Sequence, residues 1–342
     1  MLVASPRLED FPTVPSRHPS YTGELITGKM FLHAEEAQNI GIEGRGIIAG
    51  GGDTWVEGPY GSPSFHFRPR LLHFVACENV QIRGVTFRNS GSWTLSFLEC
   101  RDIAITNCIV SSNASGIKIG TESAGAFEDF VVQNCTVFDT RCEALAILTV
   151  DGARIERVSI SNITLRNIKG DALLVRLGAR RRTYRSGVSA KTGARKDVLI
   201  AQGQGTRIAD LGCALSGLPA ALLENVVLRD INLEFAVLGT PVVAGRAVPE
   251  NPKGYPGAGL FGKLPAYGFF IRHAKNVVLE NVRTSFVADD HRPAVVCDDV
   301  DGLAVTHLNA RVLSGIEPLD LVNTRRIDLG FVPPASTGKM PR

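Results

Sequence analysis

A short phrase recurs along the chain, and it limits the possible folds more than any other feature. In most copies an acidic or amide residue precedes two apolar positions that are separated by one residue, which is the period of a β-strand. Such a phrase marks one strand at a time, so its recurrence predicts many similar strands. The copies begin at Asn39, Asn79, Asp102, Asp129, Arg157, Asp197, Asn225 and Asn276, with a weaker one at Gly302.

Most of the intervals between successive copies are alike, at about 25 residues, which fits one turn of a wide solenoid. The longer intervals, which follow Asn39, Arg157 and Asn225, indicate coils with insertions. In a parallel β-helix, each coil supplies short strands that pair with the coils above and below, about 4.8 Å away. The pattern therefore predicts an all-β fold, a single parallel β-helix over residues 1–342. Residues 237–268 are rich in Pro and Gly and predict a long loop inserted between coils.

Composition supports a folded chain and excludes several classes. With 342 residues, 44% of them hydrophobic, the chain can bury a large core. No run of apolar residues is long enough to span a membrane, and the first residues lack the pattern of a signal peptide. The net charge of +3 is too small to indicate nucleic-acid binding unless the charge is clustered.

The seven cysteines include no C-x-x-C motif, and four of them follow the repeat. Cys77 and Cys100 each lie two residues before a copy of the phrase, while Cys108 and Cys135 each lie six residues after the start of one. We expect each pair to stack on successive coils as buried free thiols. A disulfide between Cys108 and Cys135, or a metal role, remains an alternative.

Three segments resemble glycoside hydrolase family 28, the polygalacturonase-like enzymes. The first is GRGIIAGGGDTW at residues 44–55, and the second runs from RPR at 68–70 through CENV at 77–80 to NSGSW at 89–93. The third is GIKIGTESAG at residues 116–125. The resemblance covers most of the chain and implies a right-handed, pectin-lyase-like parallel β-helix. It also implies cofactor-free hydrolysis of pectin-type cell-wall polysaccharides by inversion, and usually a secreted or periplasmic protein.

The sequence departs from the family at its catalytic motifs. Neither an N-T-D nor a G-D-D string occurs, as if the coils that carry the family's aspartates were missing after Trp93. The family's G-H-G triplet is matched by Ala114-Ser115-Gly116, and its R-I-K triplet by Ala146-Ile147-Leu148. The resemblance therefore predicts the fold and the enzyme class, while this chain is expected to be impaired unless other residues supply the chemistry.

Aligning the coils by their inward residues indicates where replacement carboxylates lie. The alignment pairs Leu95 and Phe97 with Ile117 and Ile119, with Leu145 and Ile147, and with Leu173 and Val175. Two residues before each of these strands stand Trp93, Ser115, Glu143 and Asp171, in the column that carries the family's G-D-D and G-H-G groups.

Glu143 and Asp171 are the predicted catalytic residues. Hydrolysis of a glycosidic bond needs one carboxylic acid and one carboxylate, and two neighbouring carboxylates push one pKa upward. Trp93, Ser115, Lys118 and Arg176 are the predicted substrate-binding residues, since aromatic rings stack on sugars and cations hold uronate groups. The competing interpretation is that these are polar turn residues, ordinary charges on a solvated sheet face and an aromatic ring packed against a loop.

Two charged segments remain. Residues 179–196 carry seven basic residues before the first acid, at Asp197, a charge that suits an anionic polysaccharide and also nucleic acid. Because no nucleic-acid motif accompanies them, the favoured interpretation is a solvated loop. Five aspartates between Asp289 and Asp301 leave calcium as a weak alternative, since the spacing of an EF-hand is absent. We therefore expect a hydrolase of acidic polysaccharides without a cofactor or metal, or else a β-helix that binds such glycans without turnover. The sequence leaves the oligomeric state open.

Overall fold

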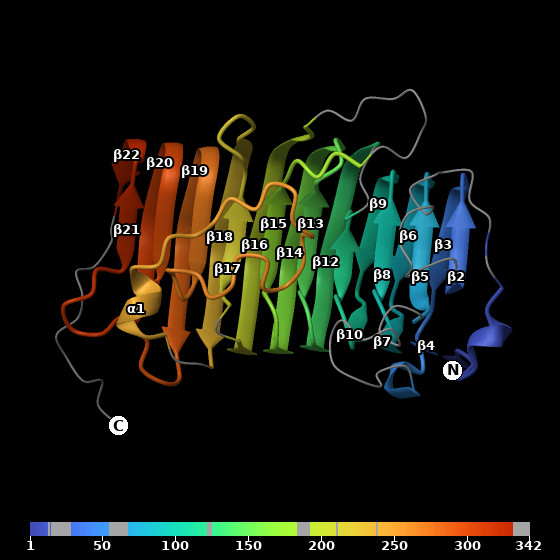
Figure 1. Cartoon of the computed structure of the whole chain (residues 1–342). Helices are drawn as coiled ribbons and strands as arrows, with labels where there is room; N and C mark the ends of the chain where they lie inside the picture. The colour runs from blue at the N-terminus through green and yellow to red at the C-terminus, as the bar shows by residue number, and fades with distance from the viewer. Residues whose placement is uncertain are drawn as a thin grey trace.

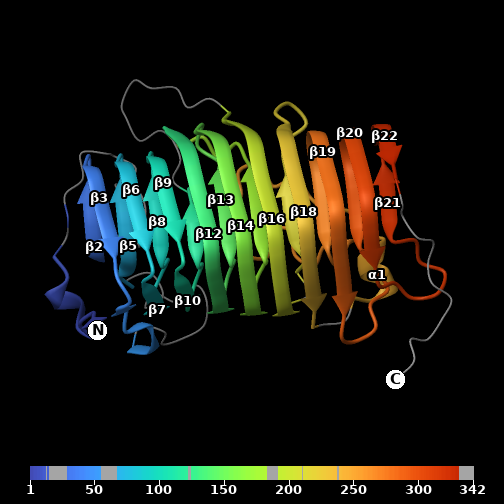
Figure 2. The same cartoon turned by 180° about the vertical axis from the view of Figure 1, so that it is seen from behind.

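The computed structural model describes residues 1–12, 14, 29–54, 68–121, 125–182, 192–209, 211–236 and 239–330. The strands follow one another along a single axis in sequence order, from β2 and β3 at one end to β21 and β22 at the other (Figures 1 and 2). Every pairing between the named strands is parallel, and each strand pairs with strands of the coils before and after it. This arrangement is the predicted parallel β-helix.

The strands form three parallel ladders, here called the first, second and third faces. The first face holds β2 (Met30–Glu35), β5 (Arg70–Val75), β8 (Leu95–Leu98), β11 (Ile117–Ile119), β13 (Leu145–Thr149), β15 (Leu173–Leu177), β17 (Cys213–Ser216), the starts of β19 (Phe269–Phe286) and β20 (Val295–Ala310), and β21 (Leu319–Val322). The second face holds β3 (Gln38–Glu43), β6 (Glu78–Arg83), β9 (Arg101–Thr106), β12 (Ala126–Thr140), β14 (Arg154–Ile168), β16 (Ala194–Ile208), β18 (Leu223–Phe235), the middles of β19 and β20, and β22 (Arg325–Leu329).

The third face begins with four short strands and continues in the long ones. It holds β1 (Leu2–Val3), β4 (Ile47–Ala49), β7 (Thr86–Ser90), β10 (Ile109–Ser112) and the C-terminal parts of β12, β14, β16, β18, β19 and β20. The helical segments in the described residues are α1 (Pro241–Ala244) and two 3₁₀ turns at Leu8–Asp10 and Gly52–Thr54. None of the described helices is long and apolar enough to cross a membrane.

The recurring phrase marks the corner between the first and second faces. The residue that opens each of the first eight copies has φ between 52° and 60°, and Gly302 has φ 88°. Asn, Asp and Gly tolerate this left-handed conformation better than other residues, so the corner selects them. Arg157 is the exception, and its guanidinium holds Asp129 through Nε–Oδ1 at 2.6 Å and Nη2–Oδ2 at 2.9 Å.

The predicted register is confirmed throughout the repeat. The first apolar residues of the nine copies pair in sequence, and the inward residues chosen for alignment on the first face pair as predicted. The long intervals that follow Asn39, Arg157 and Asn225 are therefore single coils with insertions, as the sequence indicated. The second-face ladder runs through Ile40, Val80, Ile103, Phe130, Val158, Val198, Val226, Val277 and Leu303.

The cysteine pairs stack inside the core as free thiols. Cys77 lies against Cys100 and Cys108 against Cys135, with all four side chains buried. The predicted alternative of a Cys108 to Cys135 disulfide is not what the structure shows, because both thiols are free. Stacked thiols fill ladder positions as small apolar groups do.

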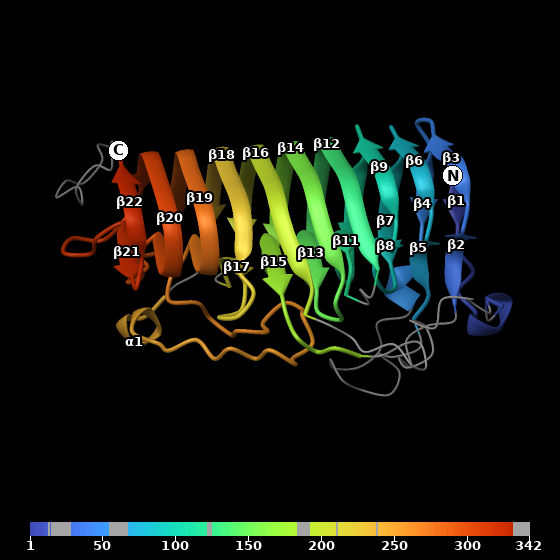
Figure 3. The ribbon, with the colours of Figure 1, turned by 90° about the horizontal axis from the view of Figure 1, so that it is seen from above.

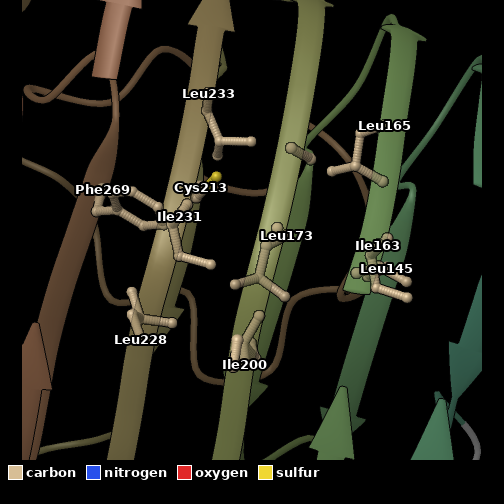
Figure 4. Close-up of a pocket in the computed structure, with 13 residues that line it drawn as sticks. Leu145, Ile163, Leu165, Leu173, Ile200, Cys213, Leu228, Ile231, Leu233 and Phe269 are labelled. Carbon is tan, nitrogen blue, oxygen red and sulfur yellow. The ribbon is translucent and has the colours of Figure 1, made fainter. Parts of the chain in front are cut away.

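The core has one local packing defect, a cavity of about 30 Å³ between β14, β16 and β18. Figure 4 shows Leu165, Ile231 and Leu233 turned toward it from the flanking coils. On β16, Gly203 and Gly205 take the inward positions that pair with Ile163 and Leu165 on one side and with Ile231 and Leu233 on the other. Two missing side chains on one coil therefore leave the space empty.

The predicted insertion covers the outer side of the first face. Its described part, residues 239–268, is called the covering segment here. It leaves β18, forms α1 and runs back along β17, β15 and β13 before it enters β19 (Figure 3). Five apolar residues of the segment pack on outward residues of the first face, forming a second hydrophobic cluster. They are Val248, Leu260, Phe261, Leu264 and Ala266, against Ala146, Leu148, Leu174, Ala214, Phe270 and Val296.

Candidate functional site

The predicted column of four residues exists at the start of the first-face strands. The backbone N–H of Gly116 donates to the carbonyl of Glu143 at 3.0 Å, and the N–H of Ala144 donates to the carbonyl of Asp171 at 3.0 Å. These ladder bonds place Ser115, Glu143 and Asp171 on three successive coils. The two predicted carboxylates are therefore stacked neighbours, held by the backbone rather than by flexible loops.

Glu143 is buried between a hydroxyl donor and a cation. Its side chain is 1% exposed, and its Oε2 accepts a hydrogen bond from the Ser115 hydroxyl at 2.5 Å. The ammonium of Lys118, also 1% exposed, lies 3.8 Å from the same oxygen. A buried carboxylate needs such partners to keep its charge. Its second oxygen, Oε1, has no hydrogen-bond partner among the described residues.

The environment of Asp171 disfavours the charged form of its carboxyl group. Burial raises the pKa of this carboxyl well above its usual value, and the neighbouring charge of Glu143 raises it further. The backbone of Gly259, in the covering segment, hydrogen-bonds to the carboxyl group and only partly offsets these effects. Its Oδ2 has no hydrogen-bond partner within the described parts of the chain. The two adjacent carboxyl groups therefore lie in different environments, Glu143 beside Lys118 and Ser115 and Asp171 buried with a raised pKa.

Lys118 is enclosed by two aromatic rings. Its Nζ lies 4.7 Å from the ring centre of Trp93 and 5.5 Å from that of Tyr255, and the guanidinium of Arg70 covers Trp93 at 4.3 Å. Trp93 is 6% exposed, so a cation already occupies the ring that was predicted to stack on a sugar. The cation–π contacts position the ammonium beside Glu143.

Arg176 points outward as predicted but does not bind either carboxylate in its hydrogen bonds. Its Nη1 donates to Ser216 at 2.8 Å, and its Nη2 donates to the carbonyl of Glu250 at 2.7 Å and that of Asn251 at 3.4 Å. The alternative of a solvated sheet face is wrong for these positions. Lys118 and Arg176 are each 1% exposed because the covering segment lies over the first face.

His73 forms a second buried polar group on this face, with Arg70 and Ser96. The hydrogen-bond donors around it decide which ring nitrogen carries the proton. Arg70 can only donate, so the contact of 2.9 Å between its Nη1 and His73 Nε2 makes that nitrogen an acceptor. The proton then sits on Nδ1, which donates to Ser96 Oγ at 2.9 Å. Burial and the charge of Arg70 lower the pKa of His73 well below its usual value. The imidazole therefore cannot take the Ser96 proton, and the pair is structural.

The contacts that the covering segment makes at this site had no signal in the sequence. Tyr255 and Gly259 contact Lys118 and Asp171, and a Cβ built on Gly257 would lie 3.6 Å from Glu143 Oε1. Sequence reasoning predicted a long loop here but no partner for it. The Pro and Gly composition shows a loop without showing where it lies.

Some of the described charges of the basic loop and of the acidic segment form internal ion pairs. Arg180 holds buried Asp151, with Nε–Oδ1 at 2.9 Å. Residues 183–191 of the basic loop lie outside the described residues.

Three carboxylates of the acidic segment contact arginine or histidine side chains of the protein. Asp290 binds Arg292 at 2.7 Å with both side chains fully buried, and His273 binds Asp299 at 2.6 Å. Asp301 accepts from Arg326 at 2.6 Å. These three carboxylates contact side chains of the protein itself, so the calcium alternative gains no support from the described geometry.

Part of the sequence is similar to known proteins. A family model described as glycosyl hydrolases family 28 matches residues 20–116. A probable exopolygalacturonase B from Neosartorya fischeri is 29% identical over 114 residues, 31% of this chain and 24% of that protein. A polygalacturonase from Persea americana is 30% identical over 103 residues, 28% of this chain and 22% of that protein. The matched segment thus spans about a quarter of the length of these relatives.

A solved structure extends the likeness to the whole fold. The family 28 exopolygalacturonase of Yersinia enterocolitica superposes with a TM-score of 0.54 at 14% identity, over 96% of this chain and 67% of that one. The right-handed parallel β-helix that the resemblance predicted is thereby confirmed. Residues 20–116 are thus similar in sequence to glycosyl hydrolases family 28, and the β-helix that carries them is similar in fold to an exopolygalacturonase of that family.

Proposed function

We propose that the chain is a glycoside hydrolase of acidic, pectin-type polysaccharides, with Asp171 and Glu143 as its acid and base. The observation that carries the proposal is the unequal environment of these two stacked carboxyl groups. Asp171 has a raised pKa, while Glu143 is paired with Lys118 and Ser115. The family's N-T-D and G-D-D strings are absent from the sequence, so another pair of carboxyl groups has to supply the acid and the base.

The mechanism assigns one role to each group. Asp171, protonated, donates its proton to the glycosidic oxygen as the bond to the anomeric carbon breaks. Glu143, ionised, accepts a proton from a water molecule whose oxygen forms the new bond to that carbon. Lys118 and Ser115 keep Glu143 charged and oriented. These steps need no cofactor.

The substrate class rests on the relatives and on the charge of the face. The relatives with matching sequence are named polygalacturonases, and a uronate polymer carries one carboxylate per sugar. Lys118, Arg176 and Arg272 lie on the outer side of the first face, where such carboxylates need cations. The proposed substrate is therefore a polygalacturonate or a related acidic glycan.

A reducing-end assay on polygalacturonate tests the proposal. We expect Asp171→Asn and Glu143→Gln each to lower turnover by about 10²-fold or more, the usual contribution of acid–base catalysis. Glu280→Gln is the matched control, because Glu280 forms an exposed ion pair with Arg229 on the second face. Turnover that survives both carboxylate changes would show that the pair is not the catalytic one.

A second function is favoured by the burial of the pair. Glu143 and Asp171 are covered, so the chain can also be a glycan-binding β-helix without turnover. In that case binding to polygalacturonate weakens as salt rises and survives Asp171→Asn. Absence of new reducing ends together with salt-sensitive binding would select this function over hydrolysis.

A further inference from the structure

The covering segment closes the carboxylate pair from outside. Gly259 hydrogen-bonds to Asp171, Tyr255 covers Lys118, and Gly257 lies over Glu143 Oε1. Glu143 is 1% exposed and Asp171 5%. A polysaccharide is far larger than this space allows, so it cannot reach either carboxyl group while the segment stays in place.

The segment is attached in two different ways along its length. Residues 260–266 are anchored by apolar packing in the second hydrophobic cluster, which excludes water. Residues 248–252 are attached mainly by polar bonds to the first face. Arg272 donates to the carbonyls of Val248 at 2.7 Å and Pro249 at 3.2 Å, and the Ala179 N–H donates to Pro252 at 2.7 Å. Polar bonds of this kind are exchangeable with those of a ligand or water.

Glu250 is the side chain that fastens this polar stretch. Its Oε1 lies 3.1 Å from Arg272 Nη1 and 2.9 Å from His273 Nε2, while the opposite nitrogen of His273 contacts Asp299 at 2.6 Å. Its own backbone carbonyl accepts from Arg176 at 2.7 Å. The Glu250 side chain is 40% exposed, so the seat is open to solvent and to competing anions.

We propose that residues 248–259 form a lid over the carboxylate pair, latched by Glu250 on Arg272 and His273, which an acidic glycan displaces. The proposal rests on the proposed function for what happens once the pair is uncovered. A uronate carboxylate has the same charge and geometry as the Glu250 side chain, so it competes for the same contacts with Arg272 and His273. Lifting the lid also frees Arg176, which adds a further cation to the uncovered face.

The variant Glu250→Gln tests the latch, and hydrogen exchange reads the lid directly. The change removes the charge of one partly exposed side chain and retains its size and hydrogen-bonding ability. We expect the amides of residues 250–260 to exchange about threefold faster, in line with the loss of one partly exposed ion pair. Glu280→Gln, which removes an exposed pair distant in sequence from the lid, is the control and should leave these amides unchanged.

Affinity provides the second readout, measured with trigalacturonic acid by calorimetry. In the Asp171→Asn background, which prevents turnover, Glu250→Gln should tighten binding by about threefold, because less of the binding free energy is used to open the lid. Unchanged exchange, or faster exchange without tighter binding, would overturn the lid. Glu250→Gln could tighten binding although the chain with Asp171 intact does not hydrolyse polygalacturonate. That outcome would support the lid and refute the proposed activity.

Discussion

The Ala144 N–H donates to the carbonyl of Asp171 at 3.0 Å, so the side chain of Asp171 is fixed beside that of Glu143 on the preceding coil. The main chains of the two residues cannot separate without breaking the ladder. Burial raises the pKa of Asp171, and the neighbouring charge of Glu143 raises it further, while Glu143 itself contacts Lys118 and Ser115. The two stacked carboxyl groups thus differ in their surroundings, because Glu143 has a cation and a hydroxyl beside it and Asp171 is buried next to Glu143.

The raised pKa of Asp171 predicts how stability depends on pH. The folded state keeps this proton at pH values where the unfolded chain has released it. The contribution of Asp171 to the free energy of unfolding is therefore greatest below the ordinary carboxyl pKa. It then falls as pH rises toward the folded-state pKa. Asp171→Asn should remove this part of the pH dependence.

Denaturant unfolding at about pH 5 and about pH 8 measures the effect of Asp171→Asn. We expect the variant to lose less stability than the wild type between the two values. Asp197→Asn, at an exposed aspartate of the second face, is the control and should retain the wild-type difference. A variant with the full wild-type pH dependence would mean that Asp171 is ionised in the fold.

The pair of Lys118 and Glu143 predicts a non-additive effect on stability. Lys118→Met leaves a buried carboxylate with only Ser115 as a partner, which should cost about 3 kcal/mol. Adding Glu143→Gln removes the uncompensated charge, so the double variant should be more stable than Lys118→Met alone. Thermal unfolding of both single variants and the double variant checks the sign. Additive losses would show that the two charges do not interact.

The sequence predicted the features that follow the repeat. The Asn39 and Asp102 phrases mark corners where φ is positive, and the inward positions of each coil have to match those of its neighbours. Both are local rules that repeat at every coil, so one sequence displays them many times. For this reason the register, the stacked cysteines and the adjacency of Glu143 and Asp171 could all be predicted.

The cover over the site could not be predicted in the same way. Tyr255 and Glu143 are far apart in the sequence, and their association depends on where a non-repeating loop returns. That return is set by apolar packing of Phe261 and Leu264 on the first face, which has no period in the sequence. Outward Lys118 and Arg176 were therefore placed correctly by alternation, while their burial was missed.

The cavity predicts a stabilising substitution at Gly203. A Cβ there would lie 3.0 Å from Ile231 Cδ1, the end of a flexible side chain that faces empty space (Figure 4). Gly203→Ala should raise the free energy of unfolding by about 1 kcal/mol, through lower chain entropy in the unfolded state and added apolar burial. Gly205→Ala is the contrasting control, since its Cβ would meet Ile208 and Leu233 at 2.9 Å. Urea unfolding should show opposite signs, and a destabilised Gly203→Ala would mean that the coil cannot accept a methyl group.

Arg157 predicts a second gain in stability, at the corner of the repeat. It has φ 55°, where its neighbours in the ladder are Asp129 and Asp197, residue types that tolerate the left-handed region. Arg157→Asn relieves this backbone cost, and the new amide can bond to Asp129 as Asn225 bonds to Asp197 at 2.7 Å. The half-exposed Arg157 loses its ion pairs with Asp129, Glu128 and Glu156, which contribute little at such exposure, and Glu156 keeps Arg154 and Lys196 as partners. We expect the thermal midpoint to rise by about 2 °C. Arg154→Asn, which removes a comparable exposed ion pair with Glu128 without changing a corner, should not raise the midpoint. An equal or lower midpoint for Arg157→Asn would show that the ion pair with Asp129, rather than backbone conformation, dominates this corner.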